Sequence, residues 1–285
     1  MLHVDPWQIP GSDDQPILGY THTPTAERAT PPRPSRGTLI LCHGFKGYMD
    51  YGFLPRLAQH ISGQGFTTLR FNFSHSGVTR DFQTFARPDL FERDTWNRQI
   101  EDLLRVLAYA RQHHPGPAAL FGHSRGGLTA LLAAARASPA PAAVITAAAP
   151  ADASRLTPEQ RRQLLDGGRL PSPSGRTGQR LYVGRDWQAQ IDQDPEAHDP
   201  LRAAEKLACP LLLLHGDDDE TVPVADLHRY QAAQPRAQTR ILPGSNHVFN
   251  APNPLTPDAP LPPATESLFN HLSAFLDEHL PPADP

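Results

Sequence analysis

The chain has 285 residues, a formal net charge of -4 and a sequence pI near 6.4. This charge argues against nucleic acid or an anionic membrane surface as the main partner. No stretch approaches the ~20 apolar residues that cross a bilayer, and the first ten residues lack the basic and apolar regions of a secretory signal, so a cytoplasmic protein is predicted.

The first third of the chain predicts a hairpin followed by a strand–helix–strand unit. Turn-forming residues at 11–14 separate the strand-like stretches Val4–Ile9 and Ile17–Thr23, which favours an antiparallel pair at a sheet edge. The prolines at 31–34 predict an extended loop after this hairpin. The next expected elements are a buried strand, a short helix and a second strand: Thr38–Cys42, Phe53–Ile61 and Thr67–Phe71.

Helical and strand patterns alternate through the rest of the chain. Apolar residues from Trp96 to Leu107 recur at helical spacing and predict a long helix with one face on a sheet. Further strands are expected at Ala118–Phe121, Ala142–Ala147, Pro210–Leu214 and Thr239–Leu242, and further helices after residue 124, at Asp226–Ala233 and around Leu268–Leu276. This alternation predicts a doubly wound, mostly parallel sheet whose ligand site lies beyond the carboxyl ends of its strands.

Residues 151–199 interrupt the alternation. Thr157, Pro158 and Gln160 form a capping box with proline at the first helical position, which predicts a short helix to about Leu165. A stretch rich in glycine and proline follows, with an isolated apolar patch at 181–183. Excursions of this size inside a compact domain usually cover or bind something, so we expect a lid in preference to a surface loop. Its seven arginines are interleaved with acids and predict a polar, solvated surface.

The pentapeptide Gly122-His123-Ser124-Arg125-Gly126 lies between a predicted strand and a predicted helix. A serine in so sharp a turn is held in a strained conformation with its hydroxyl above the sheet, and glycines two residues before and after it prevent clashes. The pattern alone is weak evidence, but the flanking strand and helix supply the required context. Ser124 is therefore a candidate nucleophile.

A nucleophilic serine needs a histidine to take its proton and a carboxylate to orient that histidine. In the order serine, acid, histidine, both partners are expected in loops that follow late strands. The run at 211–214 is followed by four carboxylates at 217–220, and the run at 239–242 is followed by His247. The residues themselves leave the choice among the four acids open.

Together these motifs resemble the α/β-hydrolase superfamily, whose acid loop commonly reads His, Gly, two variable residues, Asp, two variable residues, Val, Pro. The run from His215 to Pro223 matches this register with Asp219 as the acid. By the same resemblance, Asp217, Asp218 and Glu220 belong to a solvated acidic turn. The resemblance predicts an α/β-hydrolase fold with a core of residues 1–150 and 200–285 and an inserted lid at 151–199.

The same resemblance places an oxyanion donor in the loop after the first long parallel strand, where this chain has His43-Gly44-Phe45. The backbone N–H of Phe45 is the expected donor, and its partner is the N–H of Arg125, the residue after the nucleophile. Both donors are backbone groups and tolerate any side chain. His43 itself is interpreted as structural.

Within the superfamily, the runs His43-Gly44-Phe45 and Arg70-Phe71-Asn72-Phe73 are similar to bacterial serine esterases, including those acting on hydroxycinnamate esters, and to dienelactone-hydrolase-like proteins. The lactone hydrolases proper use a cysteine nucleophile, and haloalkane dehalogenases and epoxide hydrolases use aspartate, whereas this chain has Ser124. The resemblance implies a serine esterase for small or medium acyl groups, acting through an acyl-enzyme. A serine aminopeptidase, a thioesterase and a non-catalytic hydrolase-fold receptor are the alternatives.

We expect no cofactor and no metal, and a small-molecule ester as the partner. No histidine pair at i, i+4 has the third ligand of a zinc site, and the acids at 217–220 lack the alternating spacing of a calcium loop. Cys42 and Cys209 border apolar runs and are expected to remain unbridged thiols. His75, after the strand that ends near residue 71, is interpreted as an ordinary loop histidine in preference to a pocket residue.

Overall fold

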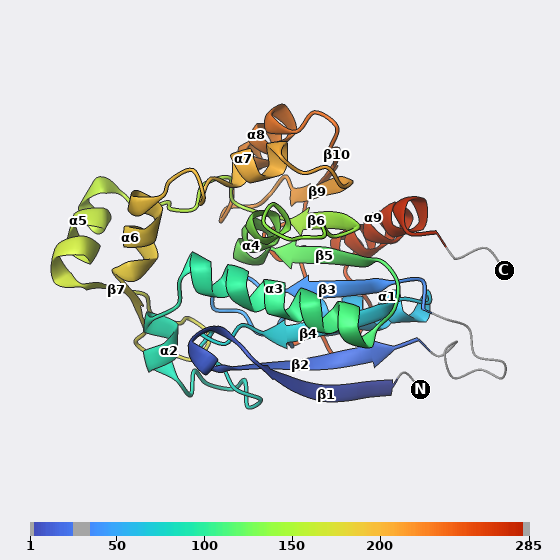
Figure 1. Cartoon of the computed structure of the whole chain (residues 1–285), viewed down its shortest axis with the longest axis horizontal. Helices are drawn as coiled ribbons and strands as arrows, with labels where there is room; N and C mark the ends of the chain where they lie inside the picture. The colour runs from blue at the N-terminus through green and yellow to red at the C-terminus, as the bar shows by residue number, and fades with distance from the viewer. Residues whose placement is uncertain (1–2, 25–34, 282–285) are drawn as a thin grey trace.

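The computed structural model describes residues 3–24 and 35–281, so the loop predicted at Pro31–Pro34 lies outside the described residues. A sheet of eight strands forms the centre of this part, in the order β1-β2-β4-β3-β5-β6-β9-β10 (Figure 1). The strands are β1 (His3–Pro10), β2 (Pro16–Thr23), β3 (Thr38–Cys42), β4 (Thr67–Asn72), β5 (Ala118–His123), β6 (Ala143–Ala147), β9 (Leu211–Gly216) and β10 (Gln238–Leu242). The six strands β4, β3, β5, β6, β9 and β10 pair in parallel, and the antiparallel β1–β2 hairpin adds to the β4 edge. The predicted α/β sheet with an antiparallel edge is confirmed.

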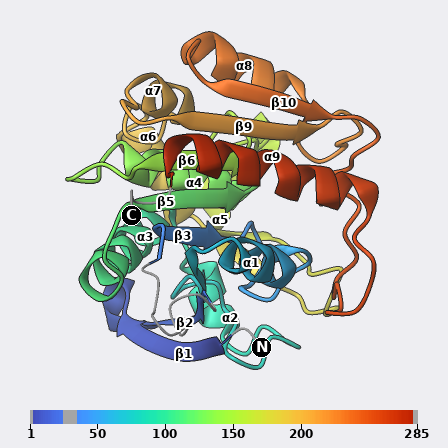
Figure 2. The ribbon, with the colours of Figure 1, turned by 90° about the vertical axis from the view of Figure 1, so that its right-hand side faces the viewer.

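Helices cover both faces of the sheet, as Figures 1 and 2 show. Strand β3 is buried throughout, and its residues alternate between two cores: Ile40 and Cys42 join one, and Leu39 and Leu41 join the other. The first core holds residues of four helices: α3 (Trp96–His113), α4 (Arg125–Ala134), α7 (Pro200–Glu205) and α8 (Ala225–Ala233). The second holds residues of α1 (Leu54–Gly63) and α9 (Pro263–His279). A strand buried on both sides requires an unbroken apolar sequence, and this explains why β3, β5 and β9 are visible as apolar runs.

Residues 151–199 project beyond the carboxyl ends of the parallel strands (Figure 1). They contain α5 (Pro158–Gly167), whose capping box is present as predicted, followed by a hairpin of β7 (Arg169–Pro171) and β8 (Tyr182–Gly184) and then α6 (Asp186–Gln193). Residues 172–181 form an irregular loop, as the glycines and prolines of this stretch suggest, but the two short strands beside the loop and α6 were not predicted. Strands of three residues carry too little alternation to be recognised, and α6 is mostly polar.

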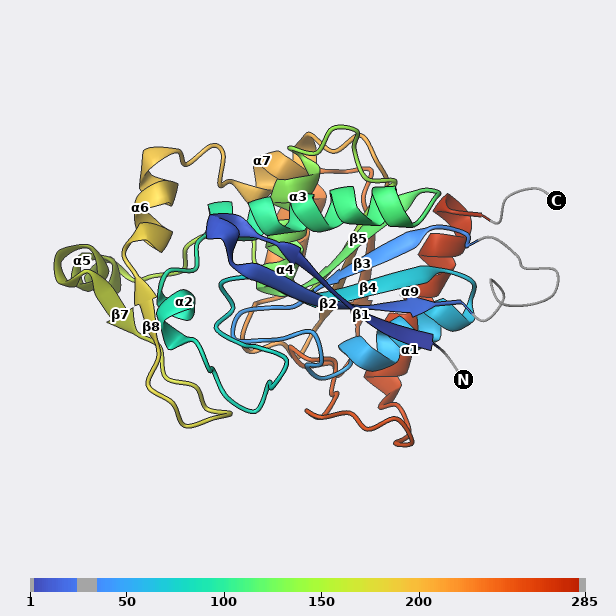
Figure 3. The ribbon, with the colours of Figure 1, turned by 60° about the horizontal axis from the view of Figure 1, so that its bottom comes forward.

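The hairpin of the inserted segment packs beside α2 (Pro88–Glu92), as Figure 3 shows. A small apolar cluster joins Leu181 of the insertion to Phe85 and Phe91 of the preceding loop and helix. Gln179 adds two hydrogen bonds, accepting from the Phe85 N–H at 2.8 Å and donating to the Phe85 carbonyl at 3.1 Å. The inserted segment is thus packed against residues of the 78–92 segment. After it, α7 (Pro200–Glu205) leads into β9.

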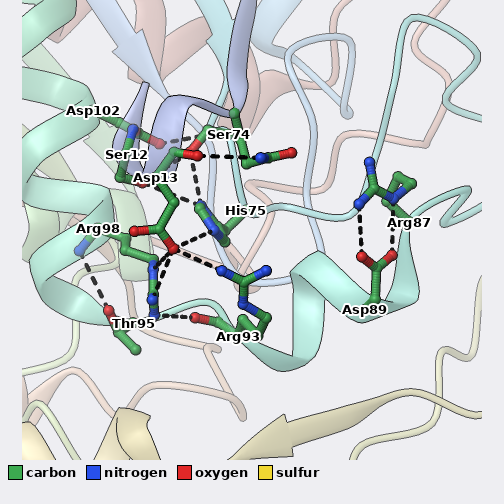
Figure 4. A network of polar contacts seen from close by, with 11 residues as sticks. Ser12, Asp13, Ser74, His75, Arg87, Asp89, Arg93, Thr95, Arg98 and Asp102 are labelled. Atoms are coloured by element: carbon green, nitrogen blue, oxygen red, sulfur yellow. Dashed lines mark hydrogen bonds and ion pairs between the residues drawn. The ribbon is translucent and has the colours of Figure 1, made fainter. Parts of the chain in front are cut away.

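The turn of the N-terminal hairpin is fastened by a buried carboxylate (Figure 4). Asp102 of α3 accepts the Ser12 N–H at 2.7 Å on one oxygen and the Ser74 N–H at 2.8 Å on the other. Burial raises the pKa of Asp102 to about 6, against the lowering effect of these hydrogen bonds. One side chain therefore connects the hairpin turn, the loop after β4 and a central helix.

His75 belongs to the same network and is completely buried. Its Nδ1 lies 3.1 Å from the Ser12 hydroxyl and 2.9 Å from the Ser74 hydroxyl, and its Nε2 lies 3.5 Å from Asp13 (Figure 4). Burial lowers the pKa of His75 to about 4, so the ring is neutral at neutral pH. His75 therefore has a structural role in the packing of this loop.

Candidate active site

Ser124 occupies the tight turn between β5 and α4 that the sequence predicts. Its φ of 54° and ψ of -124° lie in a strained region for a residue with a side chain. A Cβ at Gly122 would overlap the Gly126 carbonyl, and a Cβ at Gly126 would lie 2.5 Å from the carbonyl oxygens of Cys42 and His43. The two glycines therefore let α4 approach the ends of β5 and β3 closely. Ser124 lies in the turn at this edge of the sheet.

Ser124, His247 and Asp219 form a continuous hydrogen-bonded chain. His247 Nε2 lies 2.9 Å from Ser124 Oγ, and His247 Nδ1 lies 2.8 Å from Asp219 Oδ2. The carboxylate fixes the tautomer in which Nδ1 carries the proton, so Nε2 is free to accept the serine proton. The structure thus brings together the three residues selected from the sequence.

Asp219 is held in the ionised form by its surroundings. Burial alone would raise the pKa of Asp219. Hydrogen bonds from the rings of His215 and His247 and from the Val222 N–H together outweigh this effect and hold the pKa well below its ordinary value. Its second oxygen accepts the N–H groups of Thr221 and Val222 at 2.8 and 2.9 Å. A carboxylate with this many donors stays charged and orients the histidine firmly.

The other three acids of the loop, Asp217, Asp218 and Glu220, are exposed. Asp217 accepts the Gly244 N–H at 2.7 Å and so ties the acid loop to the loop that carries His247. The solvated acidic turn expected here is present, and one of its members also joins the two loops.

His123 is a supporting residue that the sequence did not identify. It is buried directly before Ser124, and its Nε2 lies 2.8 Å from the His247 carbonyl oxygen, to which it donates. Burial lowers the pKa of His123 to about 3, and the nearby His247 ring contributes to the lowering. A neutral His123 therefore connects the strand that carries the serine to the loop that carries the histidine.

The two expected oxyanion donors belong to segments that border Ser124. A Cβ at Gly44 would lie 3.1 Å from Ser124 Cβ, so the loop containing Phe45 rests against the serine. Arg125 is the first residue of α4, where the backbone N–H has no partner within the helix. In the described part of the chain, neither the Phe45 N–H nor the Arg125 N–H donates a hydrogen bond. Both donors are available to a substrate.

His43 anchors the loop that carries Phe45. Its Nδ1 donates to the Gly44 carbonyl at 2.9 Å, and its Nε2 accepts the Phe73 N–H at 3.3 Å. This arrangement requires a neutral ring, and burial lowers the pKa of His43 to about 4. The interpretation of His43 as structural agrees with these contacts.

A cavity of about 270 Å³ opens at Ser124, between the sheet and the inserted segment. Phe45, Trp96, Arg125 and Val222 line it from the sheet side. Its outer wall is mainly apolar and comes from the insertion, which contributes Leu156, Leu164, Leu170, Pro171, Val183 and Trp187. His75 does not line this cavity.

The prediction of a polar inserted segment is therefore wrong for its inner face. Most of its arginines point elsewhere: Arg161 pairs with Asp192 at 2.7 Å, and Arg176 lies over the Tyr48 ring at 4.7 Å. The apolar residues of the wall are separated in the sequence and converge only when α5, the β7–β8 hairpin and α6 fold together. Trp96, expected to pack on the sheet, lies at the start of α3 and also reaches the cavity.

A family model described as "Alpha/beta hydrolase family" matches residues 39–257. The match includes Ser124, Asp219 and His247 and spans well over half of the chain, so the protein belongs to the α/β hydrolase family. No curated protein matches the chain significantly.

Several solved structures share the fold. Est1E from Butyrivibrio proteoclasticus superposes with a TM-score of 0.70 at 19% identity, over 96% of this chain and 98% of that chain. Its complex with ferulic acid gives a TM-score of 0.72 at 19% identity, over 96% and 99% of the two chains. The α/β hydrolase domain-containing protein 10 from mouse gives 0.68 at 18% identity, over 96% and 99%. These similarities extend over nearly the whole chain and support the fold assignment.

The described residues offer neither a metal site nor a membrane span. Across residues 3–24 and 35–281, no group of three or more His, Cys, Asp or Glu side chains is placed to hold a metal ion. No helix in the same ranges is long and apolar enough to cross a membrane.

We predict that Gly126→Ala destabilises the protein by about 1–3 kcal/mol, because the new methyl group must displace the backbone carbonyls of Cys42 and His43. Urea unfolding measures the change in free energy. Gly167→Ala is the matched control, since nothing lies within 4 Å of its Cβ position, and it should be neutral or slightly stabilising. Equal stabilities of the two variants would contradict the close approach.

We also predict a pH-dependent contribution of His43 to stability. Its folded pKa of about 4 lies below the ordinary value of 6.5, so between these values the unfolded chain binds a proton that the folded chain does not. The free energy of unfolding then falls with decreasing pH, by at most about 1.4 kcal/mol per pH unit. The stability advantage of the wild type over His43→Asn should therefore shrink between pH 6.5 and pH 4, as measured by urea unfolding. If the free energies of unfolding of the wild type and of His43→Asn change with pH in parallel, the folded protein does not lower the pKa of this histidine.

Proposed function

We propose that the protein is a serine hydrolase that cleaves carboxylic esters of small or medium acyl groups. The observation that carries the proposal is the hydrogen-bonded chain from Asp219 through His247 to Ser124, at the mouth of a mainly apolar cavity. Family membership and the structural similarity to esterases support the same assignment. The ferulic acid bound to Est1E, a protein of similar fold, also supports a carboxylic acid as the product class.

In this mechanism Ser124 Oγ attacks the ester carbonyl carbon while its proton passes to His247 Nε2. The carbonyl oxygen becomes an oxyanion and accepts hydrogen bonds from the N–H groups of Phe45 and Arg125. Asp219 remains ionised and stabilises the protonated imidazole. Collapse of the intermediate breaks the bond to the alcohol oxygen, which leaves with the proton from His247.

The acyl-enzyme is then hydrolysed by the same groups. His247 takes a proton from water, whose oxygen attacks the acyl carbon, and the second intermediate collapses to release the carboxylic acid and return the proton to Ser124. The apolar outer wall of the cavity suits the hydrocarbon part of an acyl group, because burying that surface contributes binding free energy.

We predict that a fluorophosphonate probe labels the wild-type protein and that Ser124→Ala abolishes both labelling and turnover of a panel of 4-nitrophenyl esters. The reason is that the hydroxyl supplies both the attacking atom and the site of covalent attachment. Mass spectrometry of the labelled peptide locates the adduct. Labelling that survives the substitution would refute the assignment of the nucleophile, and thioesters or aminoacyl amides hydrolysed in preference to esters would refute the esterase assignment.

We predict that Asp219→Asn lowers kcat by about 10⁴-fold, the loss expected when the histidine is held in the wrong tautomer. The matched controls are Asp218→Asn, in an exposed position, and Asp217→Asn, which keeps a polar side chain near Gly244. Both should retain kcat within about tenfold of the wild type. Similar losses in all three variants would show that general disruption of the loop, and not the orientation of His247, is responsible.

A further inference from the structure

The side chain of Arg125 lies among the aromatic residues of the cavity wall, one residue after Ser124. Its guanidinium carbon is 4.6 Å from the Trp96 ring centre, 5.2 Å from that of Phe45 and 5.9 Å from that of Trp187. All three rings line the cavity, as does Arg125 itself. Cation–π attraction favours this placement. A cationic group is therefore fixed in the cavity wall next to the candidate nucleophile.

Most of the hydrogen-bonding capacity of this guanidinium is unused. Its side chain is only 9% exposed, and Nη2 lies 3.1 Å from Asp94 Oδ2 in an ion pair. Nε and Nη2 are nevertheless buried without an acceptor in suitable geometry in the described part of the chain, and Nη1, which is not among the buried atoms, donates no hydrogen bond there. The buried indole N–H of Trp187 also lacks a partner there. Nη1 is therefore the guanidinium nitrogen that a ligand in the cavity can reach, and its N–H groups favour a ligand atom that accepts hydrogen bonds.

The charges around the cavity favour an acceptor without charge. Arg125 already has its counter-charge in the buried Asp94, and Asp152 at the cavity wall pairs with Arg229 at 2.6 Å. Arg155 also lines the cavity, but it is exposed to solvent and donates to the Thr221 carbonyl at 2.8 Å. A substrate carboxylate would compete with Asp94 for one buried cation, whereas a neutral oxygen accepts a hydrogen bond and leaves the pair intact.

We propose that the guanidinium of Arg125 binds an uncharged acceptor oxygen on the acyl group, beyond the ester carbonyl, and so determines which esters are preferred. This proposal rests on the proposed esterase function. The substrate class is esters whose acyl group is apolar except for an ether, ketone or hydroxyl oxygen. The backbone of Arg125 serves the reaction at the ester carbonyl, and its side chain binds the rest of the acyl group.

The test compares 4-nitrophenyl hexanoate with esters in which one methylene of the chain, at each successive position beyond the α-carbon, is replaced by an ether oxygen. Each kcat/KM is divided by the rate of the same ester with hydroxide, which removes differences in intrinsic reactivity. A hydrogen bond to a charged donor predicts that the best ether ester exceeds hexanoate by about tenfold to a hundredfold. If the wild-type protein prefers none of the ether esters to hexanoate, the proposal is overturned, and no variant is needed to show this.

The double variant Arg125→Met with Asp94→Asn then removes the donor without leaving a buried carboxylate unpaired. The ratio of ether ester to hexanoate should fall to about one. Arg176→Met is the matched control: this arginine also stacks on an aromatic ring, that of Tyr48, but does not line the cavity, and the ratio should stay at the wild-type value. An unchanged ratio in the double variant would overturn the assignment to Arg125.

A further arm uses a 4-nitrophenyl ester whose acyl chain ends in a carboxylate. A stronger preference for this ester than for the best ether ester would overturn the choice of an uncharged acceptor. Failure of the proposed function itself is distinguishable, because it would abolish fluorophosphonate labelling and the turnover of every ester, hexanoate included.

Discussion

The close approach of α4 to the ends of β3 and β5 is the constraint on which the site depends. Glycine at positions 122 and 126 leaves no side chain between the helix and these strands, and Ser124 takes a strained backbone conformation as a result. The same approach brings the loop after β3 against the serine and places the first N–H of α4 beside it. The proposed nucleophile and the proposed oxyanion donors are therefore positioned by one packing arrangement.

The rest of the site is held by polar contacts between loops that are distant in the sequence. Asp217 joins the acid loop to the histidine loop, and His123 joins the histidine loop to β5. His43 joins the loop after β3 to Phe73, the residue that follows β4. Neutral histidines suit this role because one ring nitrogen donates while the other can accept. Burial keeps His43 and His123 in that neutral form.

Much of this arrangement could be predicted from the sequence, for identifiable physical reasons. Strands such as β3 and β9 are buried on both faces and read as apolar runs, and α5 is marked by its capping box. Asp219 could not be chosen from the residues alone, because four adjacent acids offer the same chemistry; the family register selected it. The inserted hairpin and α6 were missed because their strands are short, and the apolar wall was missed because its residues meet only in the folded chain. The supporting role of His123 depends on a contact across 124 positions of the sequence, which no local pattern reveals.

The order of the sheet also bears on how copies of this chain meet one another. A sheet with open edges can add a strand from another molecule, which is a common start of aggregation. One edge here is β1, whose exposed Pro6 and Pro10 cannot donate to a neighbouring strand. The other is β10, five residues long, with Arg240 exposed at its centre. The prolines of β1 and the charge at the centre of β10 thus disfavour the addition of a strand from a second copy of the chain at either edge of the sheet.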